Sequence, residues 1–216
     1  MFEETDMLID TPATQISVQP QSRHGGLLRA SLGLAGIALL LFGLGYSLIA
    51  TGIGRALFPQ AATGSVIERH GQVVGSALVA QPFASDRYFQ PRPSAASYDP
   101  MALAGSNQAR ANFDLRKRVD ETRAAVAARE GVDPAAVPGD LVTQSGGGID
   151  PHINPEAVRI QIARVAKARN LSPERIESLL AQHVEGKQLG LFGQPRVNVL
   201  QLNLALDALV VPTGVN

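Results

Sequence analysis

The sequence has 216 residues, of which 45 % are hydrophobic, and its 19 basic and 19 acidic side chains balance to a formal net charge of zero. This length suits one membrane anchor and one domain with a single core, and the balanced charge disfavours general binding of nucleic acid or anionic surfaces. Because cysteine is absent, disulfides, thiolate metal sites and a cysteine nucleophile are excluded.

Residues 1–26 are interpreted as a disordered cytoplasmic tail. They are polar, contain Pro12 and Pro20, and show neither the helical nor the strand period of apolar residues. The acidic residues at positions 3, 4, 6 and 10 also argue against binding of the tail to a membrane surface.

Residues 27–54 are predicted to form a transmembrane helix. Between Arg29 and Arg55 the only ionisable group is the phenol of Tyr46, and the run exceeds the ~20 residues that an α-helix needs to cross a bilayer. A signal peptide has an apolar core of only about 7 to 15 residues before its cleavage site, which Ala56 could mimic. A core helix of a soluble protein rarely stays uncharged over such a length. We therefore interpret the segment as a retained anchor.

Few charges bear on the orientation of this helix. Arg23 and Arg29 lie before its uncharged run, whereas Arg55 follows that run and the next cation is Arg69. The positive-inside rule then favours a cytoplasmic N-terminus. Residues 55–216 are accordingly expected to form a periplasmic or extracellular domain.

One face of the predicted helix consists of small residues. With a rotation of 100° per residue, five small residues fall within one third of the helix circumference, namely Gly33, Gly36, Gly43, Ser47 and Ala50. Small residues let helix backbones approach closely in lipid, so this face is a candidate surface for packing against a second helix. The alternative is that glycine is simply frequent in membrane helices.

The first half of the following domain carries strand and helix signals. Short β-branched runs around a glycine turn predict a β-hairpin over residues 65–79. Residues 81–97, with three aromatic residues and three prolines, are expected to lie extended over that sheet. A helix is predicted from Asn112 to Gly131, because apolar residues recur with the helical period. Residues 141–143 then suggest a short strand.

Helix-start signals recur in the C-terminal third. Asn154-Pro155 and Ser172-Pro173 each place an N-cap before a first-turn proline, with Gly186 as the expected end of the second helix. Asn198 resembles the start of a capping box before a last helix, although the alternating leucines after it also fit a strand. The predicted fold is thus one N-terminal transmembrane helix plus an α+β extracytoplasmic domain, in which a β-hairpin and a short strand pack with three to four helices.

The loop over residues 144–154 is the one stretch that invites a catalytic interpretation. Ser145 would be a nucleophile, His152 its base and Asp150 the group that orients the base. The loop lacks the glycine spacing of a nucleophile elbow, and an aspartate two places from His152 is badly placed to orient it.

The same loop allows two binding hypotheses. The backbone of Gly146, Gly147 and Gly148, followed by a helix N-terminus, would favour an anion, but no Gly-Lys-Ser/Thr follows. Asp150 and His152 would need a further ligand to hold a metal. The simpler interpretation is a turn that needs positive φ before a capped helix. His70 and His183 are expected to be exposed, without a ligand role.

Several blocks of sequence in the same order closely resemble the C subunit of the bacterial Kdp potassium-transporting ATPase. The resemblance covers about residues 28–209, and its blocks are residues 75–83, 88–95, 105–107, 140–153, 164–169 and 195–203. Where that family tends to have Ser-Gly-Gly-Ser-Asn, this chain reads Leu103-Ala104-Gly105-Ser106-Asn107. Gly105, Ser106 and Asn107 thus join the glycine loop as candidate contacts for a partner or ligand.

The resemblance implies a non-catalytic accessory subunit of a high-affinity potassium importer in the bacterial inner membrane. Its partners would be a channel-like subunit, a P-type ATPase subunit and a small single-helix subunit. The family role is described as assembly and stabilisation, with suggestions of gating ion entry or assisting nucleotide binding. The complex would use ATP, Mg and K ions, whereas this chain is expected to bind no cofactor itself. It lacks the DKTGT string around the aspartate that such pumps phosphorylate. The competing hypothesis is a membrane-anchored exported binding module or enzyme that uses the loop from Ser145 to His152.

Overall fold

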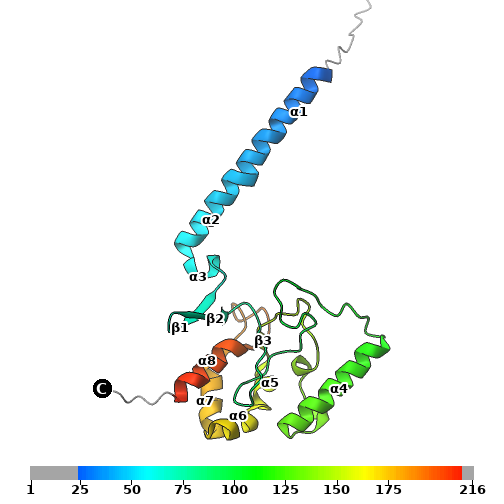
Figure 1. Cartoon of the computed structure of the whole chain (residues 1–216), viewed down its shortest axis with the longest axis vertical. Helices are drawn as coiled ribbons and strands as arrows, with labels where there is room; N and C mark the ends of the chain where they lie inside the picture. The colour runs from blue at the N-terminus through cyan, green and yellow to red at the C-terminus, as the bar shows by residue number, and fades with distance from the viewer. Residues whose placement is uncertain (1–23, 211–216) are drawn as a thin grey trace, which may run out of the picture. The chain divides into compact units, whose positions relative to one another are not determined.

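The computed structural model of the protein describes residues 24–210, and it divides into two units, Met1–Ile53 and Gly54–Asn216. In the first unit, α1 (His24–Ala38) continues through a π-helical segment (Leu39–Gly45) into α2 (Tyr46–Leu57), which crosses the boundary between the units (Figure 1). The apolar helix Gly26–Leu57 is long enough to span a membrane, as predicted. Residues 24–26, expected in the disordered tail, are helical, and the rest of that tail lies outside the described residues.

The second unit begins with α3 (Pro59–Ala62) and the predicted β-hairpin. Its strands β1 (Val66–Arg69) and β2 (Gln72–Ser76) pair antiparallel, with a bulge between Ile67 and Glu68. The connecting turn places His70 and Gly71 at positive φ, and His70 is exposed as expected. The hairpin prediction is confirmed.

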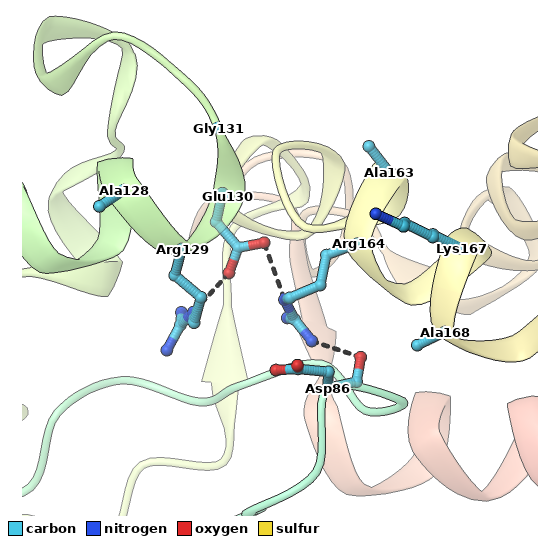
Figure 2. Close-up of a pocket in the computed structure, with 9 residues that line it drawn as sticks. All are labelled: Asp86, Ala128, Arg129, Glu130, Gly131, Ala163, Arg164, Lys167 and Ala168. Carbon is cyan, nitrogen blue, oxygen red and sulfur yellow. Dashed lines mark hydrogen bonds and ion pairs between the residues drawn. The ribbon is translucent and has the colours of Figure 1, made fainter.

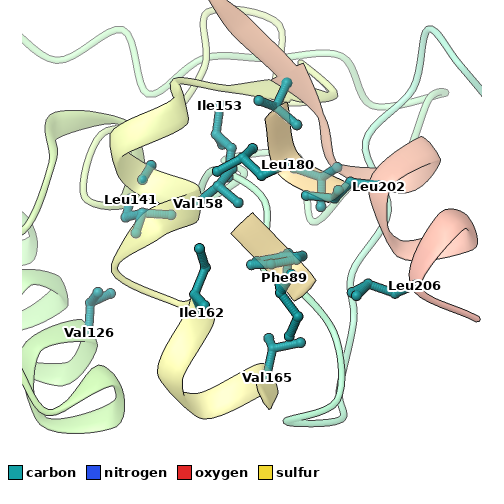
Figure 3. Packing of buried hydrophobic residues seen from close by; sticks show 14 of the residues in the cluster. Phe89, Val126, Leu141, Ile153, Val158, Ile162, Val165, Leu180, Leu202 and Leu206 are labelled. Atoms are coloured by element: carbon teal, nitrogen blue, oxygen red, sulfur yellow. The ribbon is translucent and has the colours of Figure 1, made fainter. Parts of the chain in front are cut away.

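Residues 77–112 contain no helix or strand, and the expectation that residues 81–97 cover the hairpin holds only at their start, where Gln81 Nε2 donates to the Val74 carbonyl of β2 at 3.0 Å. The fully buried Phe89 lies in the core among the helices instead (Figure 3). Its backbone N–H donates to Asn203 Oδ1 at 2.8 Å, and Asn203 Nδ2 donates to its carbonyl at 2.9 Å. Gln161 makes the same pair of bonds with the backbone of Gln90. Two buried side-chain amides thus take the place of a neighbouring strand.

The helix α4 (Phe113–Glu130) confirms the prediction for residues 112–131. Asn112 Oδ1 caps its first turn, and Gly131, at φ 70°, ends it in the left-handed conformation. The strand expected at residues 141–143 is wrong. The 3₁₀ helices Pro134–Ala136 and Gly139–Leu141 lie here, and the N–H groups of Val142 and Thr143 bond the Gly139 carbonyl rather than a strand.

The helix expected after Asn154 is broken into α5 (Pro155–Arg159) and α6 (Ile162–Arg169). The side chain of Gln161 explains the break. Its Nε2 donates to the Ala157 carbonyl at 3.0 Å, which is the helical acceptor of its own N–H, and the N–H turns to Val158 instead.

The remaining elements complete a small sheet and the core. Ser172 caps α7 (Pro173–His183). This helix ends before Gly186 because the next two residues form β4 (Val184–Glu185). The strand belongs to a sheet of order β3-β5-β4, with β3 (His152–Ile153) and β5 (Arg196–Asn198). Asn198 Oδ1 accepts from Gln201 N at the start of α8 (Val199–Val210), so the helix prediction holds there. Buried side chains of α5 to α8 pack around Phe89, and those of α4 join at Val126 (Figure 3).

Candidate functional site

The small residues of the apolar helix have open space around them. A Cβ added to Gly33, Gly36 or Gly43 would meet no atom within 4 Å. The π-helical segment, in which Tyr46 N donates to Leu41 O, widens the turn between Gly36 and Ser47. Because a wider turn rotates the residues after it about the helix axis, Gly33 and Gly36, before the segment, form a small-residue patch separate from Ser47 and Ala50, after it, and Gly43 lies within the segment. The Ser47 hydroxyl donates to the Gly43 carbonyl at 2.6 Å, so it brings no unsatisfied polar group.

The two loop stretches singled out in the sequence meet in the domain. A Cβ on Gly105 would lie 2.7 Å from the Gly146 carbonyl oxygen, and one on Gly148 would lie 2.8 Å from the Ala104 carbonyl oxygen. Gly148 also has a φ of 75°, which glycine adopts without strain. The Ser94 hydroxyl donates to the Gly148 carbonyl at 2.5 Å. The lack of a side chain at Gly105 and Gly148 therefore lets the two backbone segments cross closely. Ser106 and Asn107 directly follow Gly105 in the sequence.

The donors and acceptors of the glycine loop are largely used by the fold. The buried Ser145 Oγ accepts from Asp150 N at 3.4 Å, and within the described residues it has no hydrogen bond to His152. Gly148 N donates to the Ser145 carbonyl, whereas Gly146 and Gly147 are exposed. At the start of α5, the Asn154 side chain already accepts from Ala157 N. The arrangement favours neither a serine nucleophile nor a backbone anion cradle.

An arginine lies between the two acidic groups of this region. Arg92 Nη1 is 3.3 Å from Asp150 and 3.9 Å from Asp140, and Arg92 Nη2 donates to Thr143. Arg92, Asp140 and Asp150, together with His152, line a cleft of about 400 Å³. Across residues 24–210 there is no group of three or more His, Cys, Asp or Glu side chains that would hold a metal. The guanidinium occupies the place that a cation would take.

Asp150 is held in its ionised form. Burial raises the pKa of its carboxyl, but hydrogen bonds from the His152 ring and N–H, together with the charge of Arg92, outweigh burial and lower the pKa below its ordinary value. A depressed folded-state pKa contributes stability above the unfolded-state pKa, and that stability is lost as the pH falls through the folded-state value.

We therefore expect Asp150→Asn to lower the free energy of unfolding by about 1 kcal/mol at neutral pH. Denaturant unfolding of the full chain in detergent, repeated from pH 7 to pH 2, measures this difference. The difference in free energy of unfolding between the variant and the wild type should disappear in acid, where Asp150 is protonated in both the folded and the unfolded state. The control is Glu121→Gln, at an exposed position of α4. Its difference from the wild type in free energy of unfolding should not change with pH. A gap that stays constant with pH would contradict the electrostatic role of Asp150.

A second polar cluster is buried where α4 meets α6 (Figure 2). The Glu130 side chain is 0 % exposed, and its carboxylate accepts from Arg129 Nε at 2.6 Å and from Arg164 Nε at 2.9 Å. Arg164 also donates to the carbonyls of Asp86 and Tyr88. A cavity of about 770 Å³ lies beside this ion-pair network. The network fixes α4 and the irregular segment against α6.

A related clamp joins α6 to α8. Arg169 donates to the Arg87 carbonyl at 2.6 Å and to Asp207 at 2.8 Å, and its guanidinium lies 4.8 Å from the centre of the Tyr88 ring. Asp207 also pairs with Arg69 of β1 at 3.1 Å. The sequence patterns indicated no role for Arg92, Glu130 or Arg164. The one available signal was that all of these except Glu130 lie in blocks that carry the resemblance.

The fold and these sites define a protein that has, within residues 24–210, one helix long and apolar enough to span a membrane and an α+β domain held together by its polar clusters. Residues 28–208 match the model of the family described as KdpC, K⁺-transporting ATPase, c chain. The potassium-transporting ATPase KdpC subunit of Xanthomonas axonopodis pv. citri (strain 306) is 60 % identical over 186 residues, 86 % of this chain and 90 % of the relative. That of Xanthomonas campestris pv. campestris (strain B100) is 57 % identical over 185 residues, covering 86 % and 88 %. The subunit of Dechloromonas aromatica (strain RCB) is 45 % identical over 188 residues, covering 84 % and 97 %.

The chain belongs to the KdpC family and is thus a subunit of a P-type ATPase that transports potassium. The resemblance inferred from the sequence blocks is confirmed.

Proposed function

We propose that this chain is a non-catalytic subunit that assembles and stabilises the potassium-import complex. Its partners would be the channel-like subunit, the P-type ATPase subunit and the small single-helix subunit. The observation that carries the proposal is the open surface at Gly33, Gly36 and Gly43 on a helix long enough to span a membrane. In lipid, where apolar surface alone does not drive helices together, such close-approach surfaces favour helix association.

The domain's polar chemistry supports the non-catalytic part of the proposal. Ser145 is bonded to the backbone of Asp150, and Arg92 occupies the space between Asp140 and Asp150. The residues that a serine hydrolase or a metal site would require are thus engaged in structural contacts. ATP hydrolysis, with Mg, then belongs to the P-type ATPase subunit and the path of potassium to the channel-like subunit.

We further propose that the N-terminus is cytoplasmic and that the domain from residue 55 lies on the outer side of the bacterial inner membrane, near the ion entrance. The distribution of Arg23, Arg29 and Arg55 supports this orientation. Because the natural chain has no cysteine, Lys117→Cys at an exposed position of α4 would be its only thiol. A membrane-impermeant maleimide added to spheroplasts should label it, and labelling only after lysis would reverse the topology.

The assembly role predicts the effect of filling the small-residue patches. Gly36→Leu together with Gly43→Leu should reduce co-purification of this chain with the channel-like and ATPase subunits. If each close contact is worth on the order of 1 kcal/mol, the double variant loses roughly 30-fold in affinity. A Cβ added to Gly36 or Gly43 has no atom of this chain within 4 Å, so the helix itself should be unchanged.

The matched control is Gly52→Leu. Gly52 has equally open space, but it lies two residues from Ala50, about 200° around α2. Measuring Gly36→Leu and Gly43→Leu separately shows whether the partner contacts the helix before the π-helical segment or within it. Co-purification of the double variant at the wild-type level would remove the packing argument.

A further inference from the structure

The connection between β4 and β5 exposes three large apolar side chains within four residues. Leu189 is 88 % exposed, Leu191 76 % and Phe192 64 %. Single exposed apolar residues are ordinary on a protein surface, but a cluster of them marks an interaction site. We call residues 187–193 the apolar turn.

The apolar turn has a defined backbone. Gln188 N donates to the Phe192 carbonyl at 2.8 Å, and Phe192 N donates back to the Gln188 carbonyl at 3.0 Å. Gly190 N donates to the Lys187 carbonyl at 3.1 Å. At its base, β4 and β5 pair antiparallel, and Glu185 and Arg196 form an ion pair at 2.8 Å. The three apolar side chains are therefore presented by a hydrogen-bonded hairpin.

The turn holds a residue in a disfavoured conformation. Leu189 has a φ of 53°, in the left-handed region that residues with a Cβ rarely adopt, and Gly190 and Gly193 follow at 72° and 82°. Hairpin turns often need positive φ, as at His70 and Gly71, but leucine is a costly residue for that conformation because of its Cβ. Here the strained residue carries the most exposed of the three side chains.

The base of the apolar turn lies near the point where the chain enters the domain. Ala77 N donates to the Ser65 carbonyl at 2.9 Å, and Asn198 Nδ2 of β5 donates to the Ala77 carbonyl at 2.8 Å. Eight residues separate Leu57, the end of the apolar helix, from Val66. Even fully extended, that connection spans only about 30 Å. This short connection limits how far the domain, and with it the apolar turn, lies from the end of the apolar helix, within reach of partner subunits embedded in the same membrane.

We propose that the apolar turn inserts into an apolar pocket on a membrane-embedded subunit of the same potassium-transporting complex, an inference that rests on the assembly function proposed above. It is a second attachment point, separate from the helix.

The chemistry of the turn fits a protein pocket better than lipid. Loops that settle in the lipid interface use tryptophan, tyrosine and clustered cations. The chain has no tryptophan, and its tyrosines are at positions 46, 88 and 98. In the turn Lys187 is the single cation, and the nearby Arg196 is paired with Glu185. A fixed, strained shape suits a complementary pocket, whereas lipid requires no particular shape.

Leu191→Cys, as the only thiol, allows a direct test with an environment-sensitive fluorophore and the aqueous quencher iodide. The full chain is measured alone in nanodiscs and in the assembled complex in nanodiscs, with labelled Lys117→Cys as the exposed control. We expect iodide quenching at position 191 to fall at least threefold on assembly and to stay unchanged at position 117. Protection already present in the chain alone would show a lipid contact and overturn the proposal. An exposed label in a complex that co-purifies normally would also overturn it, while the assembly function would stand.

The energetic test is Leu191→Ser together with Phe192→Ser. Losing the burial of one large apolar side chain corresponds to roughly tenfold or more in affinity, so the double variant should bind the other subunits at least about 100-fold more weakly. Phe113→Ser, which changes an exposed apolar residue at the start of α4, is the matched control. Wild-type affinity of the double variant, or an equal loss with Phe113→Ser, would contradict a docking role of the apolar turn.

Discussion

Glu130→Ala is expected to lower the free energy of unfolding of the domain by about 3–5 kcal/mol. The carboxylate is completely buried and accepts hydrogen bonds from Arg129 and Arg164. Removing one partner of a buried ion pair leaves the opposite charge without compensation, which costs far more than the pair contributes in net terms. Here the uncompensated group would be Arg164, whose side chain is 9 % exposed.

The loss should reach beyond α4. Arg164 also holds the carbonyls of Asp86 and Tyr88, so its displacement would loosen the segment that places Phe89 in the core. Denaturant unfolding of the full chain in detergent, followed through the tyrosine signal, gives the free energy. Glu121→Ala, at an exposed position of the same helix, should change it by less than about 0.5 kcal/mol. A loss at Glu130 as small as at Glu121 would show that the ion-pair network does not hold the domain.

Asn203→Leu is expected to cost about 2–6 kcal/mol, although leucine is branched at the same carbon and is more apolar. The Asn203 amide satisfies both the N–H and the carbonyl of Phe89, and no strand is paired with that segment. Each buried backbone group left without a partner costs about 1–3 kcal/mol. The two losses would therefore outweigh any gain from a more apolar side chain.

The same unfolding measurement tests this prediction, with Gln201→Leu as the control. Gln201 lies two residues earlier on α8 and is exposed. Amide hydrogen exchange adds a local measurement, because the Phe89 N–H should lose protection in Asn203→Leu and keep it in Gln201→Leu. Unchanged stability and unchanged protection would mean that the irregular segment is held by its apolar contacts alone.

The two buried amides also explain an error of prediction. The residues around Phe89 were expected to cover the β-hairpin, since they have the composition of an extended segment. In the fold, Asn203 of α8 and Gln161, between α5 and α6, bind that segment although they follow it by about 70 to 115 positions. Local composition predicted the absence of a helix correctly, but it contains no information about which distant amide supplies the hydrogen bonds.

Some features were decided by the sequence alone, because their signals act over a few residues. The apolar run between Arg29 and Arg55 is uncharged for long enough to cross a bilayer whatever surrounds it. The N-caps Asn112, Asn154 and Ser172 start their helices through bonds to residues two or three positions away. The hairpin after residue 65 likewise depends on one local turn.

Only the tertiary structure decided the break at Gln161, the short strands β3, β4 and β5, and the crossing of Gly105 over Gly146. The same holds for the burial of Glu130 between two arginines. Strands of two or three residues are too short for a period to show, and each of the other features depends on a partner far away in the chain. Their free energy comes from contacts that exist only after the helices have packed, so no local pattern encodes them.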